Sequence, residues 1–216
     1  LDAATAGRST QVIVVDNGSV DGSVEVLRDR PGVELIELGE NTGFTHAANT
    51  GAAKASGELL LFLNPDIVAP PGSLDALASA LEERPDAWAV TPWFLNPDSS
   101  PQFLSRRLPR AGPVALALTQ WGLRFDRAAG GRTKRFRSYA SITRPRRFEV
   151  IDGVGAACLL MRRAEFEEAG RFDERYRNFF QDAELERAMM ARGRLMLGVG
   201  DISVFHEGGA SLKVIP

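Results

Sequence analysis

The stretch Gln11-Val-Ile-Val-Val-Asp-Asn-Gly-Ser-Val-Asp-Gly-Ser23 decides the fold, because it passes from an apolar run through a polar turn to a helix start. Its β-branched residues predict a short strand over Gln11–Val15, and the Asn, Asp, Gly and Ser residues that follow favour a loop. Asp21 or Ser23 can cap a helix that runs to about Arg30. The first unit of the chain is therefore a strand, a loop and a helix.

The same alternation continues along the chain. Leu59–Leu63 is a continuous apolar strand, further strands are predicted over 33–38, 88–94, 148–151, 157–161 and 195–204, and further helices over 44–55, 73–83, 164–169 and 181–192. Uninterrupted apolar strands separated by helices predict a mostly parallel sheet that helices cover on both faces. The fold class is α/β.

Length and charge limit the organisation of the chain. A protein of 216 residues with 44% hydrophobic residues can bury one substantial core, so we expect one domain over 1–216. Residues 97–147 are rich in proline and diverge from the pattern, although a short helix is expected over 114–123. Residues 101–150 hold 12 of the 26 Lys and Arg residues and two acids, a net charge of +10 against −12 elsewhere. This basic segment suggests an anionic partner or a solvated loop.

Cysteine usage and hydropathy suggest a cytoplasmic protein. The single cysteine, Cys158, cannot form an internal disulfide and lies in an apolar run, so we expect a buried thiol rather than a nucleophile. Apolar runs stay well short of the roughly 18 residues that a membrane span needs. Leu1 in place of a methionine suggests a fragment or a processed chain.

Two predicted strands end in acidic turns. Asp16 follows the first strand, and Asn64-Pro-Asp66 follows Leu59–Leu63, so both groups should lie at the carboxyl ends of strands, where open α/β sheets bind ligands. A carboxylate there can accept a hydrogen bond from a base or a ribose, or bind a hard divalent cation with substrate phosphates. The structural alternatives are an Asx-turn at Asp16 and a β-turn at Asn64-Pro-Asp66.

These and later motifs, in this order, resemble the family 2 glycosyltransferases, particularly a rhamnosyltransferase-like branch. The motifs are Val14-Val-Asp-Asn-Gly-Ser-Val-Asp-Gly-Ser23, Asn41-Thr-Gly-Phe44 with Asn49 and Gly51, Leu61-Phe-Leu-Asn-Pro-Asp66, Gly155-Ala-Ala-Cys-Leu-Leu-Met-Arg-Arg163, Gly170-Arg-Phe-Asp-Glu174, Phe179-Phe-Gln-Asp-Ala-Glu-Leu185 and His206-Glu-Gly-Gly209. The match covers nearly the whole chain apart from residues 97–147. It implies a GT-A-like fold, in which 1–96 bind the nucleotide sugar and 148–216 carry the acceptor and catalytic half.

The resemblance also implies roles for particular residues. Asp16 would contact the nucleotide base, and Asn64 and Asp66 occupy the positions of the family's Asp-x-Asp motif, with a neutral ligand at the first position. The residues implied in binding the nucleotide sugar are Asp16, Asn17, Ser19, Asn41, Gly43, Asn49 and Asn64. Asp66 and His206 would bind a divalent cation, Mn or Mg, although His206 can instead be a structural histidine because imidazole is a softer ligand than such cations usually select.

Asp182 falls where the family places its catalytic base, usually in a Glu-Asp pair that here reads Gln181-Asp182. The start of the helix over 181–192 would favour an ionised carboxylate, although a first-turn acid can also simply cap a helix. Glu184 is the alternative base, but it lies roughly 200° further around a helix of 3.6 residues per turn and should face away from the cleft.

One part of the family pattern is missing. The family's domain usually opens with an apolar strand, whereas Leu1–Ser9 looks like the tail of a helix, so we expect a gap in the sheet. The function implied is inverting transfer of rhamnose or a similar sugar from a nucleotide diphosphate to a saccharide or lipid-linked acceptor. Peripheral contact with an anionic membrane is expected, and nucleic acid is not. The alternatives are a noncatalytic nucleotide-sugar or phosphate-binding module and a nucleotidyltransferase.

Overall fold

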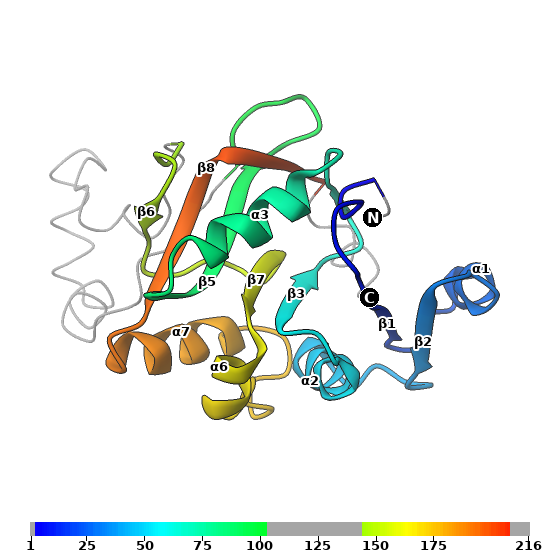
Figure 1. Ribbon diagram of the computed structural model, residues 1–216. Helices are drawn as coiled ribbons and strands as arrows, with labels where there is room; N and C mark the ends of the chain where they lie inside the picture. Colours follow the sequence, from blue (N-terminus) through cyan, green and yellow to red (C-terminus); the bar gives the residue numbers. More distant parts are fainter. Residues whose placement is uncertain (1–2, 103–143, 208–216) are drawn as a thin grey trace, which may run out of the picture.

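The computed structural model describes residues 3–102 and 144–207, which form an α/β fold with strands at its centre (Figure 1). The elements follow in the order β1 (Val12–Asp16), α1 (Ser23–Arg28), β2 (Val33–Glu37), α2 (Phe44–Lys54), β3 (Leu59–Leu63), β4 (Ile67–Val68), α3 (Ser73–Glu82), β5 (Ala87–Leu95), β6 (Glu149–Val150), β7 (Cys158–Arg162), α6 (Arg163–Glu168), α7 (Gln181–Ala191) and β8 (Leu195–His206). Every helix and strand predicted within these residues is present. The sequence does not predict β4, since its two residues give no alternating pattern.

The N-terminal lobe consists of β1, α1 and β2. The two strands form a parallel sheet of their own, in which Val12 is opposite Val33. Asp21 lies just before α1, and its Oδ1 accepts hydrogen bonds from the N–H and the hydroxyl of Ser23 at 3.1 and 2.6 Å. The N-cap position is Gly22, in the left-handed conformation and without a side-chain cap hydrogen bond, so neither predicted residue caps α1; the Asp21–Ser23 contacts fix the turn that leads into the helix.

The larger sheet has six strands in the order β3-β7-β5-β8-β4, with β6 also paired to β8. The expectation of a mostly parallel sheet needs correction here, because β5 and β8 are the only strands of the larger sheet that pair in parallel in the described part of the chain. β7 runs antiparallel to β3 and β5, and β4 and β6 run antiparallel to β8. An apolar run reports that a strand is buried and carries no information on its direction. The α/β class is confirmed, with a mixed sheet.

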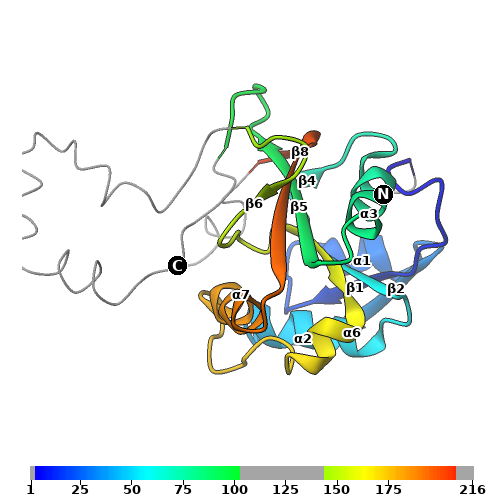
Figure 2. The same ribbon diagram turned by 60° about the vertical axis from the view of Figure 1, so that its left-hand side comes forward.

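The core lies between this sheet and its helices. Trp88 on β5 and Leu77 and Leu81 on α3 are fully buried. Figure 2 shows α3 and α7 on opposite sides of β5 and β8. Phe62 of β3 packs its ring 5.3 Å from that of Phe166 of α6, which ties the edge strand to the helix that follows β7.

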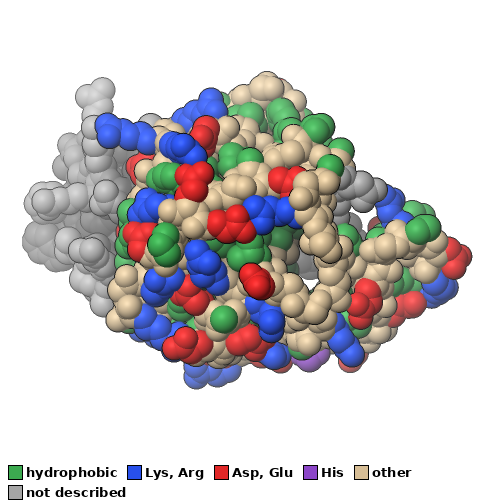
Figure 3. Space-filling view, in the orientation of Figure 1, with side chains coloured by type: hydrophobic (Ala, Val, Ile, Leu, Met, Phe, Trp, Pro, Cys, Tyr) green, Lys and Arg blue, Asp and Glu red, His purple; other side chains and the backbone are tan. Residues whose placement is uncertain are grey.

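A gap separates the N-terminal lobe from the larger sheet. Within residues 3–102 and 144–207, β1 pairs with β2 alone and β3 pairs with β7 alone. A groove of about 1990 Å³ lies between them and is lined by Val12–Val15, Leu59–Leu63 and the small residues of α2. Figure 3 shows openings where the lobe meets the rest of the protein. The gap expected from the resemblance is present.

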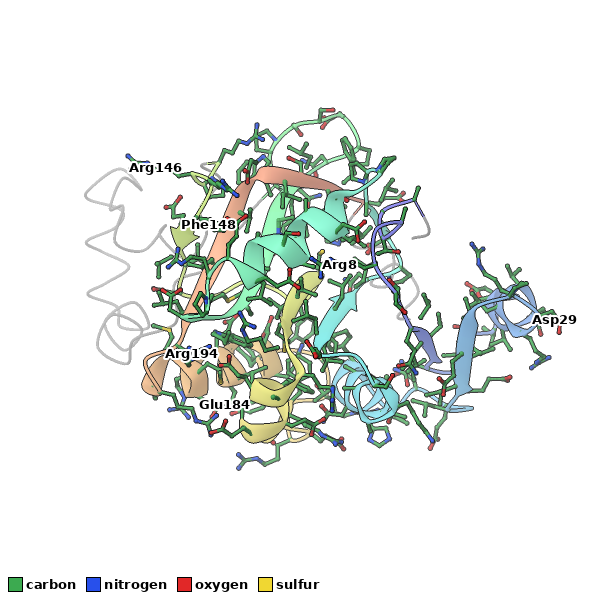
Figure 4. The ribbon with its side chains drawn as sticks, in the orientation of Figure 1. Arg8, Asp29, Arg146, Phe148, Glu184 and Arg194 are labelled. Atoms are coloured by element: carbon green, nitrogen blue, oxygen red, sulfur yellow. The ribbon has the colours of Figure 1, made fainter. Side chains whose placement is uncertain are left out.

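The N-terminal segment differs from the expected helix tail. Residues 3–8 form turns that pack against α3 rather than a helix. The N–H of Gly7 donates to Oδ2 of Asp75 at 2.8 Å, and Arg8 forms an ion pair with Glu82 at 2.7 Å, beside α3 in Figure 4. Because the segment finds its hydrogen-bond partners on α3, it does not need the partners that a helix would supply.

Some sequence-based expectations fall outside the described residues. The helix expected over 114–123 lies there, as does most of the basic segment 101–150. None of the described helices is long and apolar enough to cross a membrane.

We predict that backbone amides of β1 exchange with solvent faster than those of β5. β1 has a strand partner on one side, and Val12–Val15 are only partly buried, whereas the first eight residues of β5 are buried. Segments with few buried contacts open at lower free energy than the rest of a protein. Hydrogen exchange followed by mass spectrometry measures both strands in one experiment. Equal protection of β1 and β5 would contradict the described gap.

A second prediction concerns Cys158, which is fully buried in β7. Burial raises the pKa of its thiol to about 12, because the thiolate would lose its hydration. The native protein should therefore resist Ellman's reagent at pH 8, and the guanidinium-unfolded protein should react in full. Fast labelling of the native protein would show that Cys158 is accessible after all.

Candidate active site

Asp66 and His206 lie side by side at the end of β3. The chain leaves β3 through Asn64 and Asp66, and Ile67 then pairs with His206 at the end of β8. The N–H of Glu207 donates to the carbonyl of Asp66 at 3.1 Å and fixes the turn. As a result, Nε2 of His206 lies 3.4 Å from Oδ1 of Asp66. The sequence places these two residues 140 positions apart, and the β4–β8 pairing brings them together.

Gln102 determines which nitrogen of His206 carries a proton. Nε2 of Gln102 donates to Oδ1 of Asn96 at 2.6 Å and to the carbonyl of His206 at 2.5 Å, which orients the amide. Its Oε1 consequently faces Nδ1 of His206 at 3.0 Å. Since an amide oxygen only accepts, this network assigns the proton to Nδ1 and leaves the lone pair of Nε2, in a neutral ring, toward Asp66.

This arrangement suits a divalent cation. Oδ1 of Asp66 is buried and has no hydrogen-bond partner in the described part of the chain. An imidazole lone pair and a carboxylate oxygen repel each other at 3.4 Å unless a proton or a cation lies between them. Two ligands about 2.1 Å from one cation at right angles lie about 3 Å apart. Asp66 and His206 therefore fit two positions of a coordination sphere.

The remaining positions would belong to other groups. Among residues 3–102 and 144–207, no cluster of three or more His, Cys, Asp or Glu could hold an ion. A hard cation commonly keeps water and substrate oxygens next to one or two protein ligands. Asn64 lines the groove beside this pair and offers a neutral amide. The donor set fits a cation that is shared with a ligand.

Asp182 lies in the first turn of α7 and lines the same groove. Its side chain is 6% exposed, and one carboxylate oxygen accepts the N–H of Ala183 at 2.9 Å. Glu184, which Figure 4 labels, instead pairs with Arg187 at 2.6 Å and lines a smaller pocket together with Asp173. The predicted helix orientation is confirmed, because Asp182 reaches the groove and Glu184 points elsewhere.

The loops that follow β1 and β2 are joined by hydrogen bonds. The carboxylate of Asp16 accepts the N–H groups of Gly18 and Ser19 at 3.0 and 3.2 Å, which is the Asx-turn alternative. Oδ1 of Asn17 accepts the N–H of Thr42 at 2.8 Å, and this contact joins the loop after β1 to the loop after β2. Asp16 remains a candidate for contact with the nucleotide base, although its carboxylate already accepts hydrogen bonds from two backbone N–H groups.

Asn49 and Gly43 have structural contacts in place of the ligand contacts that the sequence suggests. Asn49 is 8% exposed, its Nδ2 donates to the carbonyl of Phe172 at 2.8 Å, and its Oδ1 accepts the N–H of Phe172 at 3.2 Å. A Cβ at Gly43 would lie 2.8 Å from the carbonyl oxygen of Arg177. Both residues hold the segment before α7 against α2, so a direct role in binding a nucleotide sugar does not fit their surroundings.

The predicted ligand residues divide into those that line the groove and those that do not. Those that line it are Asn17, Asn41, Asn64, Asp182 and His206, and those that do not are Asp16, Ser19, Gly43, Asn49 and Asp66. Sequence reasoning did not single out Gln102, which fixes His206, or the groove residues Phe179, Phe180 and Gln181 as ligand contacts. Gln181 gave one signal, since it stands where the resembled family has Glu.

Solved structures with a similar fold define the class. A crystal structure of GalNAc-T7 with UDP, GalNAc and Mn²⁺ superposes with a TM-score of 0.62 at 13% identity, over 94% of this chain and 39% of that chain. The mannosyltransferase PcManGT from Pyrobaculum calidifontis, in complex with GDP-Man and Mn²⁺, gives a TM-score of 0.54 at 19% identity, over 91% and 47% of the two chains. The fold is that of the GT-A glycosyltransferases.

Sequence comparison identifies the family. The profile of glycosyl transferase family 2 matches residues 4–170, and the chain belongs to that family. It is 31% identical to the N-acetylglucosaminyl-diphospho-decaprenol L-rhamnosyltransferase of Mycobacterium tuberculosis, over 93% of this chain and 67% of that protein. It is 29% identical to the O-antigen biosynthesis protein RfbC of Myxococcus xanthus, over 94% of this chain and 15% of that protein. The chain spans only part of each relative.

The geometry predicts that Asp66 is needed for cation binding. Asp66→Asn should weaken Mn²⁺ binding by at least about tenfold, because an amide oxygen lacks the charge that a hard cation prefers. Paramagnetic resonance of free Mn²⁺ measures the affinity without any enzymatic assay. Asp75→Asn is the matched control, since Asp75 also has a buried oxygen without a partner among the described residues but lies on α3. Equal Mn²⁺ affinity in the parent and Asp66→Asn would remove Asp66 from the site.

Proposed function

We propose that this protein is an inverting, metal-dependent glycosyltransferase that moves a sugar from a nucleotide diphosphate to a hydroxyl of a saccharide or lipid-linked acceptor. The observation that carries the proposal is the common groove, in which Asp182 stands together with Asn64 and with His206, the neighbour of Asp66. A carboxylate and a cation site around one groove supply the two groups that sugar transfer needs. Family membership supports the transfer chemistry.

The cation ligands and Asp182 have different roles in the proposed reaction. Asp66 and His206 would hold a divalent cation, whose charge would offset the negative charge that the departing diphosphate gains. Asp182 accepts the proton of the acceptor hydroxyl as its oxygen forms a bond to the anomeric carbon. Attack from the face opposite the diphosphate inverts that carbon in one displacement.

The substrate class follows the relatives. The mycobacterial relative is named for transfer of L-rhamnose to a diphospho-decaprenol-linked N-acetylglucosamine, and RfbC for O-antigen biosynthesis. We propose rhamnose or a similar sugar as the transferred group and a saccharide, free or lipid-linked, as the acceptor. The net charge of +10 over residues 101–150 supports peripheral contact with anionic lipid at the inner face of a membrane.

The alternative function is that of a noncatalytic binding module. Two features favour it, the gap beside β1 and the neutral Gln181. Such a module would bind a nucleotide sugar without turnover. Incubation with dTDP-rhamnose or UDP-sugars and an N-acetylglucosaminyl-diphospho-lipid, followed by mass spectrometry of the products, separates the two functions. Donor binding without any glycosylated product would favour the module.

Asp182→Asn is predicted to lower the rate of transfer by about 10² to 10⁴, the usual contribution of a general base. Asn keeps the size of Asp182 and can still accept the N–H of Ala183, but it cannot take up the acceptor's proton. The loss should fall on turnover and leave donor affinity nearly unchanged. Single-turnover kinetics and calorimetric titration of the donor measure the two effects.

Glu184→Gln is the matched control for this experiment. It removes a carboxylate from the same helical turn, and that carboxylate accepts hydrogen bonds from Arg187 on the surface of α7. It should therefore transfer sugar at nearly the parent rate. Normal transfer by Asp182→Asn together with an inactive Glu184→Gln would assign the base to Glu184.

A further inference from the structure

Two exposed aromatic side chains stand next to Asp182. Phe179 is 64% exposed and Phe180 is 61% exposed, whereas the other phenylalanines near this segment, such as Phe166 and Phe172, are buried. Both exposed rings line the groove that also contains Asp182. Adjacent exposed aromatics on a folded surface mark a place where a ligand or a partner binds.

The backbone that carries these two rings is held in place. Phe180 has a φ of 72°, the left-handed conformation that residues with a Cβ rarely adopt. The preceding segment is tied to α2, because the N–H of Thr45 donates to the carbonyl of Arg177 at 3.0 Å and the N–H of Phe44 donates to Oδ1 of Asn178 at 3.0 Å. A strained residue that its surroundings hold in place next to a groove indicates function.

Gln181 supplies the polar part of the same surface. Its side chain is 5% exposed, and its Oε1 has no hydrogen-bond partner within the described residues. A buried amide oxygen without a partner costs free energy, and native proteins rarely leave one unpaired. Gln181 also lines the groove. A ligand that donates a hydrogen bond at this point would satisfy it.

These features together select the chemistry of the ligand. A sugar ring has an apolar C–H face that packs on an aromatic ring, and hydroxyls at its edge that donate hydrogen bonds. A prenyl chain would cover Phe179 and Phe180 but leave Oε1 of Gln181 unpaired. A phosphate offers only acceptors at neutral pH and would oppose the same oxygen. A sugar ring is therefore the ligand that can both pack on Phe179 and Phe180 and donate a hydrogen bond to Oε1 of Gln181.

We propose that Phe179, Phe180 and Gln181 form the subsite for the acceptor's sugar ring, with its reactive hydroxyl toward Asp182. This assignment rests on the proposed function and adds to it the part of the acceptor that the protein recognises. The ring packs on the phenylalanines, and one hydroxyl donates to Oε1 of Gln181. The subsite places sugar recognition one residue before the base, so ring position and proton transfer are fixed by the same helix start.

The experiment measures binding to the 216-residue chain by saturation-transfer NMR. The sugar probe is methyl N-acetyl-β-glucosaminide, and farnesyl phosphate is the lipid and phosphate probe. The variants are Phe179→Ala, Phe180→Ala and Gln181→Leu, with Phe180→Tyr as the conservative replacement. Met190→Ala is the matched control, because Met190 is a 44% exposed apolar residue on the same helix outside the groove.

The glycoside should bind about tenfold more weakly to each of the three disruptive variants. Phe180→Tyr and Met190→Ala should bind it like the parent, and circular dichroism should show all variants folded. Unchanged glycoside affinity in the three variants, or no glycoside binding by the parent, would overturn the subsite. A loss confined to farnesyl phosphate would assign the surface to a lipid and equally overturn it.

Titration of UDP and dTDP with Mn²⁺ tests the proposed function separately. Nucleotide affinity should be the same in the parent and in Gln181→Leu, because Gln181 is assigned to the acceptor. If no form of the protein binds a nucleotide, the proposed donor chemistry fails, while the glycoside comparison still decides whether the sugar subsite exists. A loss of nucleotide binding in Gln181→Leu with normal glycoside binding would move Gln181 to the donor side and overturn the proposal.

Discussion

The two-way hydrogen bond between the amide of Asn49 and the backbone of Phe172 is the contact on which the site depends. Asn49 stands on α2, in the half of the chain that contains the N-terminal lobe, and Phe172 begins the segment that leads to α7. Because no strand pairing joins the lobe to the larger sheet in the described residues, contacts of α2 contribute to this connection together with those of Gly7 and Arg8 to α3. Nδ2 of Asn49 also donates to Oε1 of Glu174 at 3.1 Å. Hydrogen bonds from His46 and then Asn49 hold the pKa of Glu174 below its ordinary value, so it stays charged.

Much of the fold could be predicted from local sequence, because strand β3 and helices α2 and α3 carry clear apolar patterns. The direction of β7 could not, since Cys158–Arg162 is buried on both faces and reads the same in either direction. The partner of β4 is equally hidden, because its pairing with His206 joins residues far apart in the chain. Patterns within one segment give its structure, whereas strand neighbours depend on long-range packing.

Candidate site residues could be predicted from the sequence where the residue type itself suggests a role. They could not be predicted where the role depends on which residues are neighbours in space. Asp66 and Asp182 are carboxylates that follow a strand or begin a helix, and the structure places Asp182 in the groove and Asp66 against His206. Asn49 belongs to the same motifs, yet its amide is used within the fold. An amide can equally bind a ligand or a backbone, and only its surroundings decide between them. Gln102 carries no motif, since its importance comes from its distance to His206.

The gap beside β1 should affect one end of the groove more than the other. Asp16 ends β1 of the N-terminal lobe, and Asn17 and Asn41 lie in the loops that follow β1 and β2. No strand pairing joins this lobe to the larger sheet in the described residues, so the end of the groove that is proposed to meet the nucleotide has the least support. Asp66 and His206 stand on strands of the larger sheet, and the segment before Asp182 is held against α2 by Asn49 and Thr45. Mobility of the lobe would then weaken donor affinity before it disturbed the cation site or the base. The proposed nucleotide contacts and the proposed base therefore stand on different parts of the fold, which separates the effects of a defect in either one.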